Sequence, residues 1–194
     1  MRHNLSEIKS VIEDRRSIRP EFFSSRKVHK EIVMELLDAA KWAPTHRYTQ
    51  PWQFKVFLGD GLKKLSEFQS EVYRTKKADD FKQDKHDKLR DRPLLATAII
   101  GICLKRDEAE RDPIEEELAS VSMAAQNMML AAKARGIDSC PVGIQHDDCA
   151  RLLLKFPEDW VVGKIKRFCR NLNFRRLPLS SEDRSYRQGK YDYY

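Results

Sequence analysis

The chain has 194 residues, of which 41% are hydrophobic and 35% charged, and its formal net charge is +7. This length suits one domain with a sizeable core, and the composition excludes a disordered chain. The longest apolar run, residues 94–104, is far shorter than the roughly 20 residues that span a bilayer, and the first ten residues lack the apolar core of a signal peptide. We therefore expect a soluble, cytoplasmic protein whose four cysteines are reduced.

The first half of the chain predicts two short helices, a strand and a polar helical segment. Apolar residues recur at helical spacing over residues 5–14 and 30–42. Residues 52–58, WQFKVFL, alternate between apolar and polar side chains, which predicts a strand. The Lys- and Asp-rich stretch from residue 60 to about 90 predicts a long surface helix or a pair of helices.

The second half predicts the centre of the fold. The continuous apolar run 94–104 predicts a fully buried central strand. A long Ala- and Met-rich helix follows, with Asp112 expected as its N-cap, Pro113 at its first position and Gly136 at its end. Three further elements are predicted: a strand over 137–143, a helix over 146–155 and a strand around 160–169. Because the strands recur too irregularly for βαβ units, the pattern favours an α+β fold.

The common signatures of nucleotide, hydrolase and zinc sites are absent: GxGxxG, GxxxxGK[ST], GxSxG and HExxH do not occur. The run HDDC at 146–149 begins a predicted helix, where acidic residues suit the positive end of the helix dipole. We therefore predict no metal site.

The run RRSIR, residues 15–19, places three guanidinium groups and a hydroxyl within five residues. The planar fork of donors on arginine matches the oxygens of a phosphate. The run by itself is a weak signal and is more typical of a solvated surface cluster, so both interpretations stay open at this point.

Five motifs in a fixed order resemble those of the FMN-dependent nitroreductase family, in its short, single-domain branch. They are RRSIR, AAKWAP at 39–44, QPWQF at 50–54, LLATAIIGICL at 94–104, and GIDSCPVG at 136–143 after the Ala- and Met-rich helix. The resemblance covers residues 8–143. It implies a mostly antiparallel central sheet flanked by helices, in a homodimer with two FMN molecules at the subunit interface.

The resemblance assigns the first cofactor-binding residues to the RRSIR run. Arg15, Arg16 and Ser17 occupy the positions that grip the ribityl phosphate, and Arg19 occupies the position that approaches the pyrimidine edge of the flavin. A fixed cation at that edge is chemically sensible, because hydride uptake leaves negative charge on the pyrimidine side.

Two further segments receive cofactor roles from the resemblance. His46 matches a histidine that reaches the FMN of the partner subunit, although a loop histidine that caps the preceding helix is the alternative. Tyr48 stands where many members have an asparagine that contacts the flavin. The backbone amides expected to face the isoalloxazine ring are those of Pro141, Val142 and Gly143.

The implied activity is the reduction of nitroaromatics, quinones or similar small oxidants by NADH or NADPH, in ping-pong fashion through FMN. No side chain is expected to act as a general acid, so we predict no catalytic residue of the chain's own. Residues 1–170 are expected to form the FMN-binding domain, and residues 171–194 a basic arm that packs on this domain or on the partner subunit.

Two other functions stay open. Residues 164–194 carry nine Lys and Arg against three Asp and Glu, interleaved with aromatic residues, a composition typical of single-stranded RNA binding. The rest of the chain is nearly neutral and lacks an RNA-binding motif, so we expect no nucleic-acid partner. The other alternative is a flavin-binding relative that lacks general reductase activity, or one specialised in flavin breakdown or dehalogenation.

Overall fold

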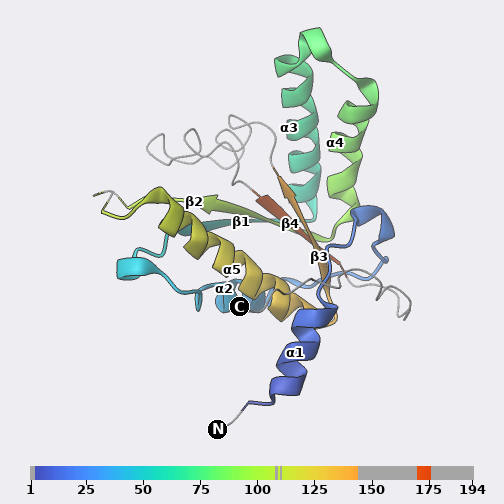
Figure 1. Cartoon of the computed structure of the whole chain (residues 1–194). Helices are drawn as coiled ribbons and strands as arrows, with labels where there is room; N and C mark the ends of the chain where they lie inside the picture. Colours follow the sequence, from blue (N-terminus) through green and yellow to red (C-terminus); the bar gives the residue numbers. More distant parts are fainter. Residues whose placement is uncertain (1–2, 108, 110, 144–169, 176–194) are drawn as a thin grey trace, which may run out of the picture.

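The computed structural model describes residues 3–107, 109, 111–143 and 170–175 (Figure 1). Within them the elements follow one another along the chain as α1 (Leu5–Asp14), η1 (Pro20–Phe22), α2 (Lys30–Ala40), η2 (His46–Tyr48), β1 (Trp52–Leu58), α3 (Asp60–Lys76), η3 (Ala78–Asp80), α4 (Gln83–Leu95), β2 (Ala98–Leu104), α5 (Ile114–Ala134), β3 (Asp138–Gly143) and β4 (Arg170–Arg175). The mixture of helices with one sheet confirms the expected α+β class.

The described strands form one antiparallel sheet in the order β1-β2-β4-β3. Trp52 pairs with Leu104 at one end of the β1–β2 ladder, and Leu58 pairs with Ala98 at the other. β4 lies between β2 and β3, so a strand from late in the sequence completes the centre of the sheet. Residues 171–175 therefore belong to the sheet, and the boundary expected at residue 170 falls inside β4.

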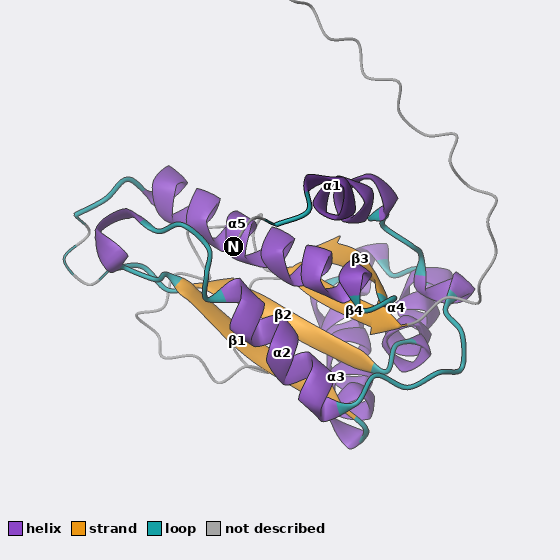
Figure 2. Cartoon of the chain, turned by 90° about the horizontal axis from the view of Figure 1, so that it is seen from below, coloured by secondary structure: helices purple, strands orange, loops and turns teal. Residues whose placement is uncertain are grey.

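Helices cover both faces of the sheet. α2 and α5 pack side by side on one face, and α3 and α4 lie on the other (Figure 2). β2 is buried along its whole length and sends Ile100 and Ile102 to the α2–α5 side but Ile99 and Cys103 to the α3 side. This alternation is the period of two that a strand between two layers requires.

α5 supplies the main contact with the sheet. Val121, Ala124, Met128 and Ala132 recur at spacings of three and four and are fully buried. The small alanines allow the helix to approach both the sheet and α2. The long Ala- and Met-rich helix expected from the sequence is therefore confirmed, and its apolar face forms part of the core.

Most predicted elements in the described residues are confirmed, with two corrections. The strand predicted over 94–104 begins only at Ala98, because Leu94 and Leu95 form the last turn of α4. Asp112 is not the N-cap of α5: the helix begins at Ile114, Pro113 holds the cap position and no side chain caps it. The Lys- and Asp-rich segment from residue 60 to about 90 was predicted as one long helix or a pair of helices, and the structure shows the pair, α3 and α4. The predicted helix 146–155 and strand 160–169 lie outside the described residues.

Candidate functional site

The arginine-rich segment Arg15–Arg19 lies along the outer edge of β3. Ser17 pairs with Ser139 in a parallel bridge, and the backbone N–H of Ile18 donates to the carbonyl of Ser139 at 3.2 Å. In Figure 1 the dark blue chain that leaves α1 passes beside β3 before it reaches α4. The structure thus brings the predicted residues of RRSIR to the strand that carries Pro141, Val142 and Gly143.

The side chains of this segment are not equivalent. Arg16 donates from Nη1 to the carbonyl of Arg15 at 2.9 Å and also to the carbonyl of Glu13, both at the C-terminal end of α1. A cation is favourable there because the last carbonyls of a helix carry partial negative charge. Arg16 therefore stabilises α1, whereas Ser17 and Arg19 are exposed at the sheet edge.

A charged cluster continues from Arg19 toward α4. Arg92 lies with Nε 2.8 Å from Oε1 of Glu21, and a backbone hydrogen bond together with this guanidinium holds the pKa of Glu21 below its ordinary value. The pKa of the Cys140 thiol on β3 is raised, mainly by burial and to a lesser extent by the negative charge of Glu21. Cys140, which is half-buried, therefore stays protonated at neutral pH.

The donors at this edge fit a phosphate ester such as that of FMN. The exposed hydroxyl of Ser17 stands next to Arg15 and Arg16, which are half-buried, and the exposed Arg19 follows two residues later as a separate cation. A phosphate binds best to several charge-assisted and neutral hydrogen-bond donors at once. Val142, 41% exposed, adds apolar surface further along β3, which suits a flat ring.

The second predicted segment, around His46, is a tight turn before β1. Three non-glycine residues in it have left-handed backbone: Arg47 (φ 47°), Tyr48 (φ 57°) and Gln50 (φ 45°). The Thr45 hydroxyl accepts from the backbone N–H of Gln50 at 3.0 Å. Such a conformation is costly for residues with a Cβ, and it is often kept where function requires it.

The turn is fixed to the β2–α5 connection. The backbone N–H of Lys105 donates to the carbonyl of Pro51 at 2.7 Å. Asp112 lies with Oδ1 3.7 Å from Nε2 of His46 and 3.5 Å from Nε of Arg47. The ring of His46 nevertheless stays half exposed, and Tyr48 is 89% exposed.

The two predicted groups lie at opposite ends of α5. The His46 turn contacts the beginning of the helix, and Ser139 follows just after its end. Figures 1 and 2 agree on this separation, which for a helix of 21 residues is about 30 Å. Within one chain, therefore, the RRSIR segment lies beside β3, whereas His46 and Tyr48 lie far from both.

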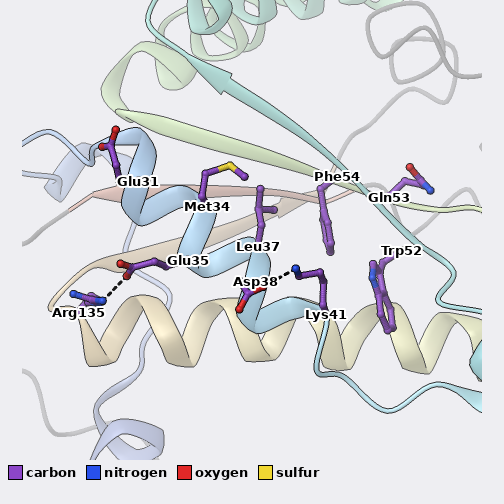
Figure 3. A pocket seen from close by; sticks show the side chains of 10 residues that line it. All are labelled: Glu31, Met34, Glu35, Leu37, Asp38, Lys41, Trp52, Gln53, Phe54 and Arg135. Atoms are coloured by element: carbon purple, nitrogen blue, oxygen red, sulfur yellow. Dashed lines mark ion pairs between the residues drawn. The ribbon is translucent and has the colours of Figure 1, made fainter.

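A groove of about 840 Å³ lies elsewhere, between α2 and β1. Figure 3 shows the aromatic rings of Trp52 and Phe54 on one side and the polar side chains of α2 on the other. An ion pair closes one end, with Nη2 of Arg135 2.5 Å from Oε2 of Glu35. None of the predicted cofactor-binding residues lines this groove, so it is not the predicted flavin site.

The described residues lack two kinds of feature. No helix among them is both long and apolar enough to cross a bilayer. No group of three or more His, Cys, Asp and Glu in the described part of the chain is arranged to hold a metal ion.

Comparison with known proteins gives consistent results. A model of the nitroreductase family matches residues 12–165. Nitrobenzene nitroreductase of Ectopseudomonas oleovorans is 29% identical over 80% of this chain and 82% of its own length. A nitroreductase-like protein of Bacillus cereus is 25% identical, with a TM-score of 0.71 over 97% of this chain and 95% of its own. The FMN-dependent nitroreductase of Mycobacterium smegmatis, solved with NADPH, has a TM-score of 0.64 at 19% identity, over 96% of this chain and all of its own.

Proposed function

The chain belongs to the nitroreductase family, and on this premise we propose that it is an FMN-dependent oxidoreductase that passes electrons from NADH or NADPH to small oxidants. Its relatives include enzymes named for nitrobenzene and for chloronitrobenzene, which supports nitroaromatics as one substrate class, with quinones as another. The observation that carries the proposal within the structure is the pairing of Ser17 with Ser139, because it assembles the phosphate donors beside the strand expected to face the flavin ring.

Each side chain at the β3 edge has a proposed task. Arg15, Arg16 and Ser17 hold the FMN phosphate, and Arg16 also stabilises the end of α1. Arg19 provides a positive charge at the pyrimidine edge of the flavin. The backbone of Pro141, Val142 and Gly143 supports the ring. FMN, when bound, supplies the hydride chemistry, so the tasks of the chain are to bind, to orient and to exclude water, and no catalytic residue of its own is required.

We propose that the complete site needs two subunits. His46 and Tyr48 lie about 30 Å from the β3 edge of their own chain and are exposed at the opposite end of α5. In a two-fold symmetric dimer the same two surfaces meet reciprocally, so the turn of one subunit reaches the β3 edge of the other. The apolar side chains of α1 that remain exposed, Leu5, Ile8 and Ile12, offer surface for such an interface.

The order of the reaction follows from a shared site. The nicotinamide donor and the oxidant use the same flavin face in turn, which gives ping-pong kinetics. We also propose a cytoplasmic location, where both nicotinamide donors are available. Residues 176–194, which contain most of the arm that raised the possibility of RNA binding, lie outside the described residues, while Arg170, Phe174 and Arg175 belong to β4.

Steady-state kinetics with the FMN-loaded protein test the proposal. With NADPH or NADH varied against several fixed concentrations of nitrobenzene or a quinone, we expect parallel double-reciprocal lines. FMN binding without any nicotinamide oxidation would instead support the flavin-binding alternative that lacks reductase activity.

A further inference from the structure

Asp112 is a buried carboxylate with no capping role. Its side chain is only 3% exposed. Asp112 stands one residue before Pro113, the N-cap of α5, so it does not occupy the position from which an acid ordinarily accepts hydrogen bonds from the first helical amides. In α5 the amides of Glu116 and Glu117 donate to the backbone carbonyl of Pro113 instead. The charge of Asp112 is therefore available to something other than the helix.

The side chain of Asp112 faces the two basic residues of the turn. Its Oδ1 lies 3.5 Å from Nε of Arg47 and 3.7 Å from Nε2 of His46, while Oδ2 is buried without a hydrogen-bond partner among the described residues. A buried carboxylate is costly unless it is paired. The partners available to Asp112 are Arg47 and His46. The imidazole ring of His46 has a second acidic neighbour, Glu116, whose Oε2 lies 3.8 Å from Nδ1.

The backbone of Asp112 is itself held in place. Arg106 donates from Nη2 to the carbonyl of Asp112 at 2.8 Å and from Nε to Oε2 of the buried Glu117 at 2.9 Å. The other oxygen of Glu117 accepts from the backbone N–H of Asp107 at 2.8 Å. The backbone of Asp112 is therefore a fixed point that can support the turn.

The turn needs such a point, because its backbone is unfavourable by itself. Arg47 and Tyr48 are consecutive and both left-handed, a combination that chains of L-residues avoid unless surrounding contacts impose it. The carboxylate of Asp112 contacts Arg47 within this pair and His46 just before it. The ion pair between the buried carboxylate of Asp112 and the half-exposed guanidinium of Arg47 is one such contact.

We infer that Asp112 is a positioning residue, which fixes the left-handed turn at Arg47 and thereby sets where His46 is presented. Its effect on the cofactor rests on the proposed function, in which His46 reaches the FMN of the partner subunit. Asp112 does not touch FMN in this scheme and acts through the turn alone.

A first test needs no cofactor. Trypsin cleaves after Arg47, which is half exposed, and mass spectrometry measures the rate of this one cut in the FMN-free protein. Asp112→Asn removes the charge at nearly constant shape, and Glu115→Gln, at an exposed acid in the same region of α5, is the matched control. We expect cleavage about tenfold faster in Asp112→Asn alone, as for loss of one pairwise contact; equal rates in both variants would overturn the inference.

A second variant keeps the test decisive if the asparagine protein does not fold. Asp112→Glu retains the charge and extends the side chain toward atoms that are 3.5 and 3.7 Å away, so we expect cleavage no faster than in the wild type. Cleavage accelerated equally by Asp112→Glu and Asp112→Asn in folded protein would show that packing, not charge, is what matters, and would overturn the inference.

A double-mutant cycle separates the inference from the proposed function. If Asp112 acts through His46, Asp112→Asn weakens FMN binding about tenfold in the wild type and has no effect in His46→Ala. An equal loss in both backgrounds would overturn the action through His46. If His46→Ala leaves FMN affinity unchanged while Asp112→Asn still accelerates cleavage, Asp112 positions the turn and it is the proposed contact of His46 with flavin that fails.

Discussion

The backbone N–H of Ile18 donates to the carbonyl of Ser139 at 3.2 Å, although 121 residues separate them in the chain. This hydrogen bond holds the arginine-rich segment against the edge of β3, so that the RRSIR and GIDSCPVG motifs form one continuous surface. The proposed flavin site depends on that surface.

Ser17→Ala is expected to weaken FMN binding with little change in stability. Its hydroxyl is exposed, so its loss leaves no buried group unpaired, while a hydrogen bond to a charged phosphate contributes about 1.5 kcal/mol or more. The dissociation constant, measured by quenching of flavin fluorescence, should rise at least about tenfold. Ser25→Ala, at an exposed serine outside the RRSIR segment, is the control, and an equal response from both variants would contradict the assignment.

A mixed dimer tests whether the site is shared between subunits. When a Ser17→Ala chain pairs with a His46→Ala chain, a shared arrangement places both changes in one site and leaves the other site intact. The mixed dimer should therefore bind about one FMN with wild-type affinity, although each parent binds weakly. If both its sites bind as weakly as those of the parents, Ser17 and His46 act on the same subunit's flavin or do not act together.

Glu117→Ala is expected to destabilise the protein strongly. Glu117 is 1% exposed and pairs with Arg106, which is 13% exposed, so the substitution leaves a guanidinium buried without its partner carboxylate. Loss of one member of a buried pair costs about 3–5 kcal/mol, which urea unfolding measures. Glu115→Ala, in the exposed part of the same turn, should change the free energy of unfolding by less than about 0.5 kcal/mol; a similarly small effect of Glu117→Ala would be inconsistent with this pair as a fixed support.

The reactivity of Cys140 should report on the site. Because burial and Glu21 raise the pKa of its thiol, little thiolate is present at neutral pH. Iodoacetamide should therefore alkylate Cys140 more slowly than it alkylates the thiol of free glutathione. The alkylation rate of Cys140 should continue to rise at pH values where the rate for glutathione is already constant. FMN bound over the neighbouring Pro141 should lower the alkylation rate of Cys140. Peptide mass spectrometry follows this one cysteine. A rate equal to that of glutathione at pH 7 would contradict the raised pKa, and a rate that FMN does not change would place the flavin elsewhere.

Local sequence patterns predicted much of the fold. The alternation in WQFKVFL appears as β1, and the apolar repeat after Pro113 appears as α5. Leu94 and Leu95 were wrongly assigned to a strand because a continuous apolar run has no period that distinguishes a strand from the last turn of a helix. In the structure they close α4, and Leu94 is 49% exposed.

The site was predictable only in part, for a similar reason. The family resemblance predicted RRSIR and SCPVG as cofactor segments, but their proximity comes from a tertiary contact between Ser17 and Ser139 that no local pattern indicates. The role of Asp112 was wrongly predicted: an acid before Pro113 is the usual sign of an N-cap, whereas its carboxylate faces Arg47 instead. No spacing in the sequence indicates that contact, because Arg47 is 65 residues away.

The central claim is that this chain binds FMN and reduces it with a nicotinamide donor. Anaerobic titration of the FMN-loaded protein with NADPH, and separately with NADH, measures this directly through the yellow flavin absorbance. We predict that at least one donor bleaches the flavin in a 1:1 ratio and that nitrobenzene restores the colour. A protein that binds no FMN, or an FMN complex that neither donor bleaches, would contradict the account.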